Sequence, residues 1–266
     1  MSQTVTWGTI RSYLSALRFF QIRCGLPDPS LSSLPRLTYV LKGIHRVNPE
    51  HQRKHRLPIT MHMLLALHGV WSKPPVTYDN VMLWAACCLG FFGFLRAGEF
   101  TCTGQDAMDP PLSPSDVKVD SRTNPRLVTV HLRHSKTDPF GVGCKIYLGH
   151  TNTTPCPVAA VLSYLSLRPS SSGPLFLFQD GTPLTRATLV THLRTALAQA
   201  GIDSSCYSGH SFRIGAATAA AQAGYSDSFI QTLGRWKSAA FVSYIRSSPT
   251  DLAAVAPTLA RQSQGH

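Results

Sequence analysis

The chain has 266 residues, and 43% of them are hydrophobic, which is enough for a buried core and excludes a predominantly disordered chain. Charged residues make up only 14%, yet 25 lysines and arginines against 13 acids give a net charge of +12. This excess favours a polyanionic partner, nucleic acid before a membrane surface, although a merely basic globular protein would have the same charge.

The first 58 residues hold most of the charge excess, with nine Lys or Arg and two acids. Residues 4–25 have the apolar spacing of an amphipathic helix, and residues 36–47 form a second helical stretch. Between them and Pro58, the basic stretch "NPEHQRKHRLP" shows no periodicity and is typical of a linker. We therefore predict a helical domain over residues 1–52 and a basic linker over 53–58. The first residues lack the apolar run of a signal peptide.

After Pro58, residues 59–71 and 78–95 are predicted to be helices. The uncharged run 81–95 is too short for a bilayer, which needs about 20 apolar residues, so a buried core helix is favoured and no membrane partner is expected. Alternating apolar residues predict two strands within 125–149, joined by the turn "SKTDPFGVG". Helices are predicted over 156–169, 185–201, 209–224, 226–236 and 238–247. This second domain, 59–250, is mainly α with one small antiparallel β element, and a tail, 251–266, follows it.

Seven scattered cysteines, with no C-x-x-C pair, indicate buried thiols of an intracellular protein rather than a disulfide framework. No spaced set of Cys and His resembles a zinc site, and no Walker-type or G-x-G-x-x-G loop is present. The sequence therefore predicts neither a metal nor a nucleotide cofactor.

A few side chains could act together on a phosphodiester. Metal-free cleavage needs a nucleophile, cations around the phosphoryl oxygens and an acid for the leaving oxygen. Arg96 follows the most apolar segment, Lys136 lies in the predicted hairpin turn, and "GHSFR" places His210 and Arg213 three residues apart. Taken singly, His210, Lys136 and Tyr244 have ordinary explanations, as a capping histidine, a solvated lysine and a core tyrosine, and only Arg96 is unusual by itself.

Their order and spacing resemble the tyrosine recombinase (phage integrase) family. More narrowly, "SKTDPFG", "GHSFRIGAAT" and "LGRWKS" resemble the recombinases of eukaryotic DIRS-type and Crypton-type mobile elements, over residues 5 to 250. The resemblance implies a helical core-binding (SAM-like) N-terminal domain, truncated here, followed by a catalytic domain with the DNA breaking-rejoining enzyme fold. It also implies a mobile-element origin, such as a retrotransposon, and a nuclear location.

The same resemblance assigns roles for proton and phosphoryl transfer. Tyr244 would attack the scissile phosphate and form a 3′-phosphotyrosine, leaving a free 5′-hydroxyl. His210 would accept the tyrosine proton, and Lys136 would protonate the departing 5′ oxygen. Free tyrosine has a pKa of about 10, so it needs such a base or a strongly positive site. Because the phosphotyrosine conserves the energy of the bond, rejoining would need no ATP.

The remaining roles concern the phosphate oxygens. Arg96 and Arg213 would bind the non-bridging oxygens, since planar guanidinium groups match phosphate geometry. Trp236 would pack against the phosphate and donate a hydrogen bond to it. Glu99 would orient Arg96 and His210 without reacting.

The expected partner is double-stranded DNA, bound by a homo-tetramer when two duplexes are synapsed. The N-terminal helices and linker would close a clamp on the DNA backbone through seven basic residues: Arg11, Arg18, Lys42, Arg46, Arg53, Lys54 and Arg56. Two alternatives stay open. One is a domesticated DNA-binding protein that no longer recombines, and the other is a type IB topoisomerase, which relaxes DNA with a similar catalytic set.

Overall fold

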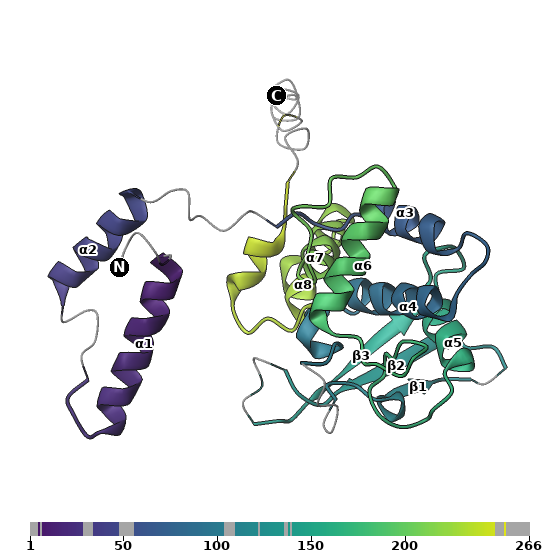
Figure 1. Cartoon of the computed structure of the whole chain (residues 1–266), viewed down its shortest axis with the longest axis horizontal. Helices are drawn as coiled ribbons and strands as arrows, with labels where there is room; N and C mark the ends of the chain where they lie inside the picture. The colour runs from purple at the N-terminus through teal and green to yellow at the C-terminus, as the bar shows by residue number, and fades with distance from the viewer. Residues whose placement is uncertain are drawn as a thin grey trace, which may run out of the picture. The chain divides into compact units, whose positions relative to one another are not determined.

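The computed structural model describes residues 5, 7–28, 34–47, 56–103, 110–121, 123–135, 138, 140–247 and 253 (Figure 1). The chain divides into two compact units, residues 1–55 and 56–266. Lys136, Arg53 and Lys54 lie outside the described residues, and so does the predicted tail 251–266 apart from Ala253.

The described residues of the first unit form two helices, α1 (Trp7–Arg23) and α2 (Pro35–Val47). They contact each other where the ring of Trp7 lies 4.7 Å from that of His45. No residue of α1 is buried, and α2 buries only Leu41, while large apolar side chains such as Phe20 are exposed. Two helices thus do not close a core of their own.

The second unit is built around a helical core in which α4 is central. This helix carries no charge apart from Asp79 in its first turn, and it packs against α5 and α7. Because neighbours cover it on several sides, it can be apolar around most of its circumference. In the part of the chain that is described, no helix has the length and apolarity to cross a membrane. The helices of this unit are α3 (Met61–Trp71), α4 (Tyr78–Phe92), α5 (Pro157–Leu167), α6 (Arg186–Gln199), α7 (Ser211–Gln222) and α8 (Asp227–Leu233).

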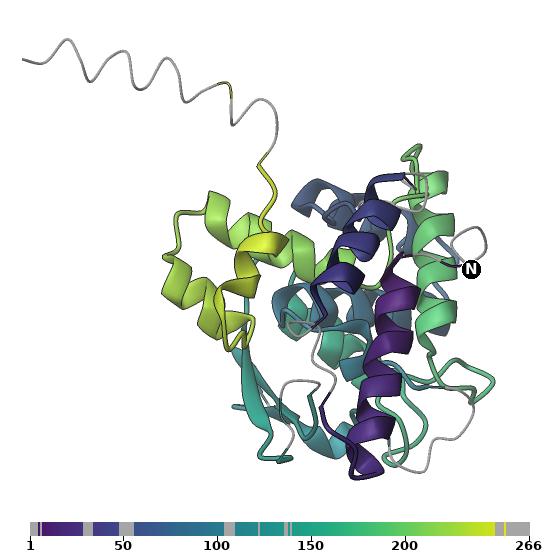
Figure 2. The ribbon, with the colours of Figure 1, turned by 90° about the vertical axis from the view of Figure 1, so that its left-hand side faces the viewer.

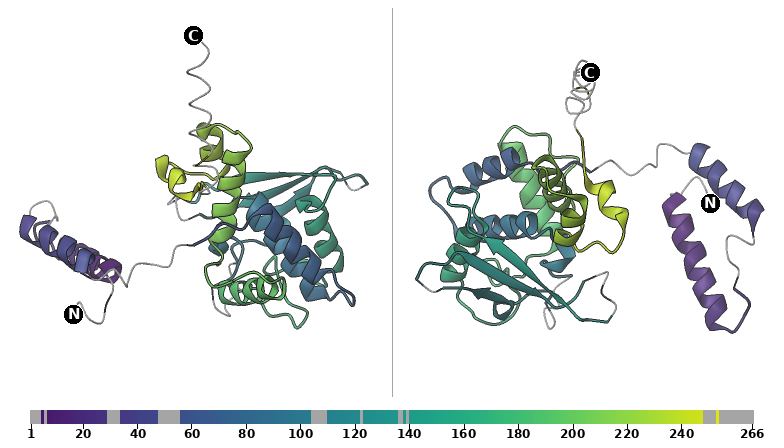
Figure 3. Two further views of the ribbon diagram at one scale, coloured as in Figure 1. Left: turned by 90° about the horizontal axis from the view of Figure 1, so that it is seen from above. Right: turned by 180° about the vertical axis from the view of Figure 1, so that it is seen from behind.

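A three-stranded antiparallel sheet covers one side of the helices (Figure 3). It consists of β1 (Val117–Val119), β2 (Leu127–Leu132) and β3 (Cys144–Gly149) in that order. Val130 of β2 pairs with Val117 on one side and with Ile146 on the other. Alternate residues of β2 and β3 are buried against the helices, as the period of two requires. The fold is thus mainly α with a small antiparallel sheet, as predicted from the sequence.

Three local features differ from the sequence predictions. The helix predicted over 78–95 ends at Phe92, so Arg96 is not on it, and a 3-10 turn η3 (Ala97–Glu99) follows. Strand β1, preceded by the 3-10 turn η4 (Pro114–Asp116), was not predicted, because three residues are too few to show an alternation. The helix predicted over 238–247 is the 3-10 helix η5 (Ala239–Tyr244), which packs with α7 and α8 at one end of the unit (Figure 2).

Candidate active site

The turn after α4 presents Arg96. Gly93 ends the helix, and Phe94 has a φ of 50°, which redirects the backbone before η3. Glu99 then fixes the arginine twice: its Oε2 accepts from the Arg96 backbone N–H at 2.8 Å, and its Oε1 accepts from Nη1 at 2.7 Å. The Glu99 side chain is 5% exposed and that of Arg96 is 18% exposed. The acid is therefore buried, while the arginine keeps an edge open to solvent.

Arg213 lies on α7 and is fully buried. Its Nη1 donates to the carbonyl oxygen of Phe94, and its Nη2 donates to that of Gly234. Burial lowers the pKa of this guanidinium, and the like charges of Arg96 and Arg235 lower it further. Because burial and neighbouring positive charges destabilise this cation, an anion that binds beside it would stabilise it.

Tyr244 is the last residue of η5, and its ring faces the same group of residues. Ring centroids lie 4.9 Å from His210 and 5.0 Å from Trp236, and the guanidinium carbon of Arg213 lies 5.7 Å from the Tyr244 ring. The backbone at this position is tied to α7, because the Thr218 hydroxyl donates to the Tyr244 carbonyl oxygen at 3.3 Å. The phenol is thus positioned by two elements, η5 and α7.

His210 caps the beginning of α7 and is brought close to the Arg96 turn by its neighbour Gly209. A Cβ at Gly209 would lie only 2.5 Å from the Cβ of Ala97, so a larger residue would push the two turns apart. Burial lowers the pKa of His210, and the positive charges of Arg213 and Arg96 lower it further. The lowered pKa favours the neutral imidazole, which is the form that can accept a proton.

A cavity of about 500 Å³ opens onto these side chains. Arg96, Glu99, His210 and Tyr244 line it, while Arg213 lies beneath them in contact with Trp236, its guanidinium carbon 4.2 Å from that ring. The structure therefore brings together six of the seven residues expected at the catalytic site. The seventh, Lys136, lies outside the described residues, but the sequence neighbours of its turn, His134 and Ser135, line the same cavity.

Two arginines at this site were not predicted from the sequence. Arg186, the first residue of α6, lines the cavity, and Arg235 forms an ion pair with Glu99 at 3.1 Å. Arg235 directly precedes Trp236 in "LGRWKS". This position beside a candidate residue is the sequence feature that could have indicated a place at the site. For Arg186 the sequence held no comparable signal, because its neighbourhood looks like any helix beginning.

The basic residues expected to contact DNA are placed differently in the first unit. Arg11 stacks over Trp7 at 5.0 Å, and Lys42 lies over Tyr39 at 5.8 Å. Arg18 is paired with Asp28, whereas Arg46 is exposed on α2. Arg56 is exposed as well, at the beginning of the second unit.

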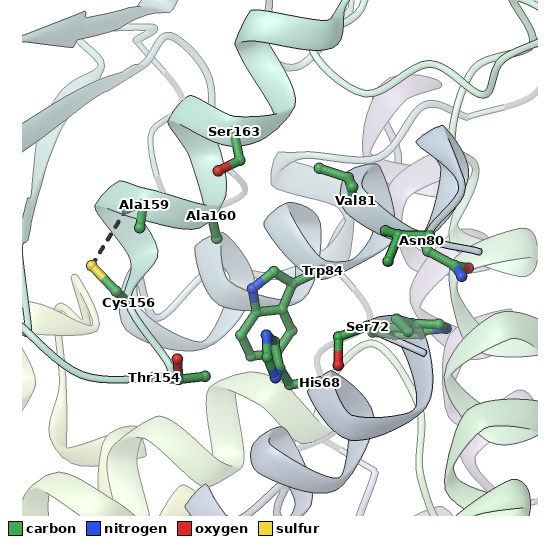
Figure 4. A pocket seen from close by; sticks show the side chains of 12 residues that line it. His68, Ser72, Asn80, Val81, Trp84, Thr154, Cys156, Ala159, Ala160 and Ser163 are labelled. Atoms are coloured by element: carbon green, nitrogen blue, oxygen red, sulfur yellow. Dashed lines mark hydrogen bonds between the residues drawn. The ribbon is translucent and has the colours of Figure 1, made fainter. Parts of the chain in front are cut away.

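A second cavity, of about 270 Å³, lies among α3, α4 and α5 (Figure 4). His68 and Trp84 both line it and pack against each other, with ring centroids 4.8 Å apart. Cys156 lies at its edge, where its sulfur accepts from the backbone N–H of Ala159. None of the six described catalytic candidates lines this cavity, so it is separate from the candidate active site.

Part of the second unit is similar in sequence to a known protein family. Residues 149–250 match the phage integrase family. The matched segment contains His210, Arg213, Trp236 and Tyr244, but not Arg96 or Glu99. Among the curated proteins no match was found.

Solved tyrosine recombinases share the fold. XerA recombinase superposes with a TM-score of 0.56 at 16% identity, covering 91% of this chain and 79% of that one. A lambda integrase fragment bound as a dimer to its core site gives 0.54 at 18% identity, covering 93% and 92%. XerH recombinase, in a post-cleavage complex with its DNA substrate, gives 0.55 at 16% identity; 77% of this chain is covered, and the match spans 52% of the XerH chain. At these identities the likeness establishes the fold of a tyrosine recombinase catalytic domain.

Proposed function

We propose that this protein cleaves and rejoins DNA as a site-specific recombinase, through a 3′-phosphotyrosine at Tyr244. The observation that carries the proposal is the convergence of the Tyr244 ring with His210 and Trp236, beside a cavity that Arg96 also lines. These residues come from the turn after α4, the residue before α7, the turn after α8 and the end of η5, and a structural explanation for each one would not account for their meeting.

The chemistry of the residues suits attack on a phosphodiester. Neutral His210 accepts the proton of Tyr244 as its oxygen attacks phosphorus, and the 5′ oxygen departs with a proton from Lys136. Arg96 and Arg213 stabilise the charge that develops on the non-bridging oxygens. No step depends on a metal ion or on ATP.

Unpaired donors support a phosphate at this site. The indole Nε1 of Trp236 and the Nε of Arg213 are buried, and neither has a hydrogen-bond partner among the described residues. Most buried donors are paired, so these two, whose side chains are in contact, suit an acceptor that arrives from outside, although Arg168 Nη1 and Arg235 Nε also have no partner among the described residues. A phosphate oxygen is such an acceptor.

Finer assignments belong to the same proposal. The motifs quoted above favour a recombinase of the DIRS or Crypton type, encoded by a mobile element such as a retrotransposon and acting in the nucleus. Residues 1–52 would form a short core-binding domain, 53–58 a basic linker, 59–250 the catalytic domain and 251–266 a tail. Recombination would require a homo-tetramer on two synapsed duplexes of DNA.

The test is covalent trapping. The full chain is incubated with randomly nicked duplexes made from the DNA that flanks its gene, so that cleavage near a nick releases a short fragment and blocks religation. We expect a protein–DNA adduct that survives denaturation and is lost in Tyr244→Phe. An adduct that persists in Tyr244→Phe would contradict the assignment of the nucleophile.

The same assay separates the alternatives. DNA binding without an adduct would favour a DNA-binding protein that no longer recombines. An adduct accompanied by relaxation of a supercoiled plasmid, with no strand exchange between two duplexes, would favour the activity of a type IB topoisomerase. Exchange between duplexes is the result expected for a recombinase.

A further inference from the structure

Arg235 makes an unusual set of contacts next to the candidate active site. Its Nη2 donates to Glu99 Oε2 and to the Phe94 carbonyl oxygen, both at 3.1 Å. Its Nη1 donates to the carbonyl oxygens of Gly93 at 3.0 Å and Leu233 at 3.3 Å. With 15% of the side chain exposed, this guanidinium joins the turn after α4 to the turn after α8.

The backbone at this position would suit a different residue. Arg235 has a φ of 57°, in the left-handed region that glycine adopts freely and that costs other residues stability. The preceding residue is a glycine, but it has an ordinary negative φ. An arginine is thus kept at a position where the backbone favours glycine, so contacts of its side chain must offset the strain.

Of the Arg235 contacts, the ion pair with Glu99 is the one that affects Arg96. Glu99 is the carboxylate shared by two arginines: Oε1 accepts from Arg96, and Oε2 accepts from Arg235. Without Arg235, Arg96 would be the main countercharge of the buried carboxylate. The positive charge of Arg96 would then be largely neutralised within that pair and would attract a phosphate less strongly. With Arg235 in place, the pair of arginines exceeds the charge of Glu99 by one.

We propose that Arg235 is a positioning residue for DNA cleavage, which balances the charge of Glu99 so that Arg96 is oriented and still attracts the scissile phosphate. Nη1 and Nη2 of Arg235 each donate twice to oxygens of the protein, so Arg235 acts through Glu99 and not by binding phosphate. The inference rests on the proposed function, because it assigns Arg235 a part in the same reaction.

The experiment measures single-turnover cleavage of a trapped duplex by the full chain, at saturating DNA. Arg235→Gln is expected to slow cleavage about tenfold or more while DNA affinity changes by less than about twofold, because the loss lies in the transition state. Arg235→Lys, which keeps the charge, is expected to retain more of the rate. Adding Glu99→Gln to Arg235→Gln is expected to restore part of the rate, because an uncharged amide then replaces the carboxylate that pairs with Arg96.

A matched control tests for simple destabilisation. Arg168 is also buried and donates to the carbonyl oxygens of Leu175, Ser172 and Pro174, but it is not among the residues of the candidate site. Arg168→Gln should lower the thermal unfolding temperature at least as much as Arg235→Gln and leave saturating cleavage unchanged. Equal slowing by both variants would mean that lost stability explains the effect, and the inference would be wrong.

Other outcomes are equally decisive. Normal cleavage by Arg235→Gln, or losses that simply add up in the Glu99→Gln/Arg235→Gln variant, would overturn the positioning role and leave the proposed function standing. A wild-type chain that forms no adduct would overturn the proposed function, and the role of Arg235 in it as well. The two failures are thus distinguished by the wild type.

Discussion

Arg96 owes its position to a turn rather than to the apolar helix that precedes it. The sequence shows fifteen uncharged residues before this cation, and it suggests a buried helix holding the arginine directly. Instead the helix ends at Phe92, and Glu99 holds Arg96 through both its backbone and its side chain. A buried acid thus fixes a cation that is still partly exposed, as a phosphate ligand needs to be.

This geometry gives a specific expectation for substitutions at Arg96. Arg96→Ala should fold and fail to cleave. Arg96→Lys keeps the charge but loses the planar fork that binds two oxygens, so cleavage should fall on the order of a hundredfold. Single-turnover cleavage, with circular dichroism as the check on folding, measures both. Wild-type rates in Arg96→Lys would mean that the arginine is structural.

His210 provides an expectation for pH. Burial, together with the charges of Arg213 and Arg96, lowers the pKa of His210 below its usual 6.5, so the base stays neutral until more acidic pH. The cleavage rate of wild type at low DNA concentration should therefore fall as pH decreases, with a midpoint below 6.5. A midpoint above 6.5 would contradict this environment for His210.

The same shift affects folding. Because the pKa of His210 is lower in the folded chain than in the unfolded one, the unfolded chain binds the proton first as the solution is acidified. The contribution of His210 to stability is complete above about 6.5. It decreases as the pH falls from there to the folded pKa. Urea unfolding at several pH values would follow this loss.

At the scale of elements, α7 supports the site through both of its faces. It carries Arg213, and His210 is the residue just before it. Its Thr218 hydroxyl donates to the Tyr244 carbonyl oxygen at the end of η5 and accepts from the Arg246 backbone N–H at 3.1 Å. One helix thus sets the positions of the proposed base, one cation and the proposed nucleophile. We infer that displacement of η5 from α7 would impair cleavage without removing any catalytic group.

Thr218→Val tests this link. The valine has nearly the same shape but leaves the Tyr244 carbonyl and the Arg246 N–H without their partner, so stability should fall by about 1–2 kcal/mol and cleavage should slow more than DNA binding weakens. Thr232→Val is the matched control, because that hydroxyl donates to Ser228 within α8. Equal effects on cleavage from both variants would count against the link.

An element could be predicted from the sequence only where its local residue pattern is long enough to be recognised. The apolar run of α4 and the alternation of β2 and β3 are long enough to be recognised, and their types were predicted correctly. Strand β1 is too short for a pattern, and the end of α4 depends on Phe94 adopting a positive φ, which no residue preference indicates. The candidate set was found through motif order, whereas the Glu99–Arg235 pair is a long-range contact that periodicity does not reveal.

At the scale of the whole molecule, charge and architecture are divided between two units. The first holds two helices with few buried residues and much of the basic excess, whereas the second holds the core and the candidate site. Such a division suits a clamp in which one unit supplies affinity for the DNA backbone and the other supplies chemistry. The clamp is a proposal about the basic side chains of the first unit.

Salt dependence tests the clamp. Arg11→Ala, Lys42→Ala and Arg46→Ala combined should weaken binding to duplex DNA and flatten the dependence of log K on log salt by roughly one unit per lost phosphate contact. Ser12→Ala, an exposed neutral change on the same helix, should leave the slope unaltered. An unchanged slope in the triple variant would mean that these side chains are solvated and not in contact with DNA.

The most direct test of the whole account is to identify the covalent bond itself. A trapped adduct, made with DNA labelled at one end or the other, is digested with protease, and the residue that carries the nucleotide is identified by mass spectrometry. We expect Tyr244 to be joined to a 3′-phosphate, with a free 5′-hydroxyl on the released fragment. A bond to another residue, or to a 5′-phosphate, would contradict the account.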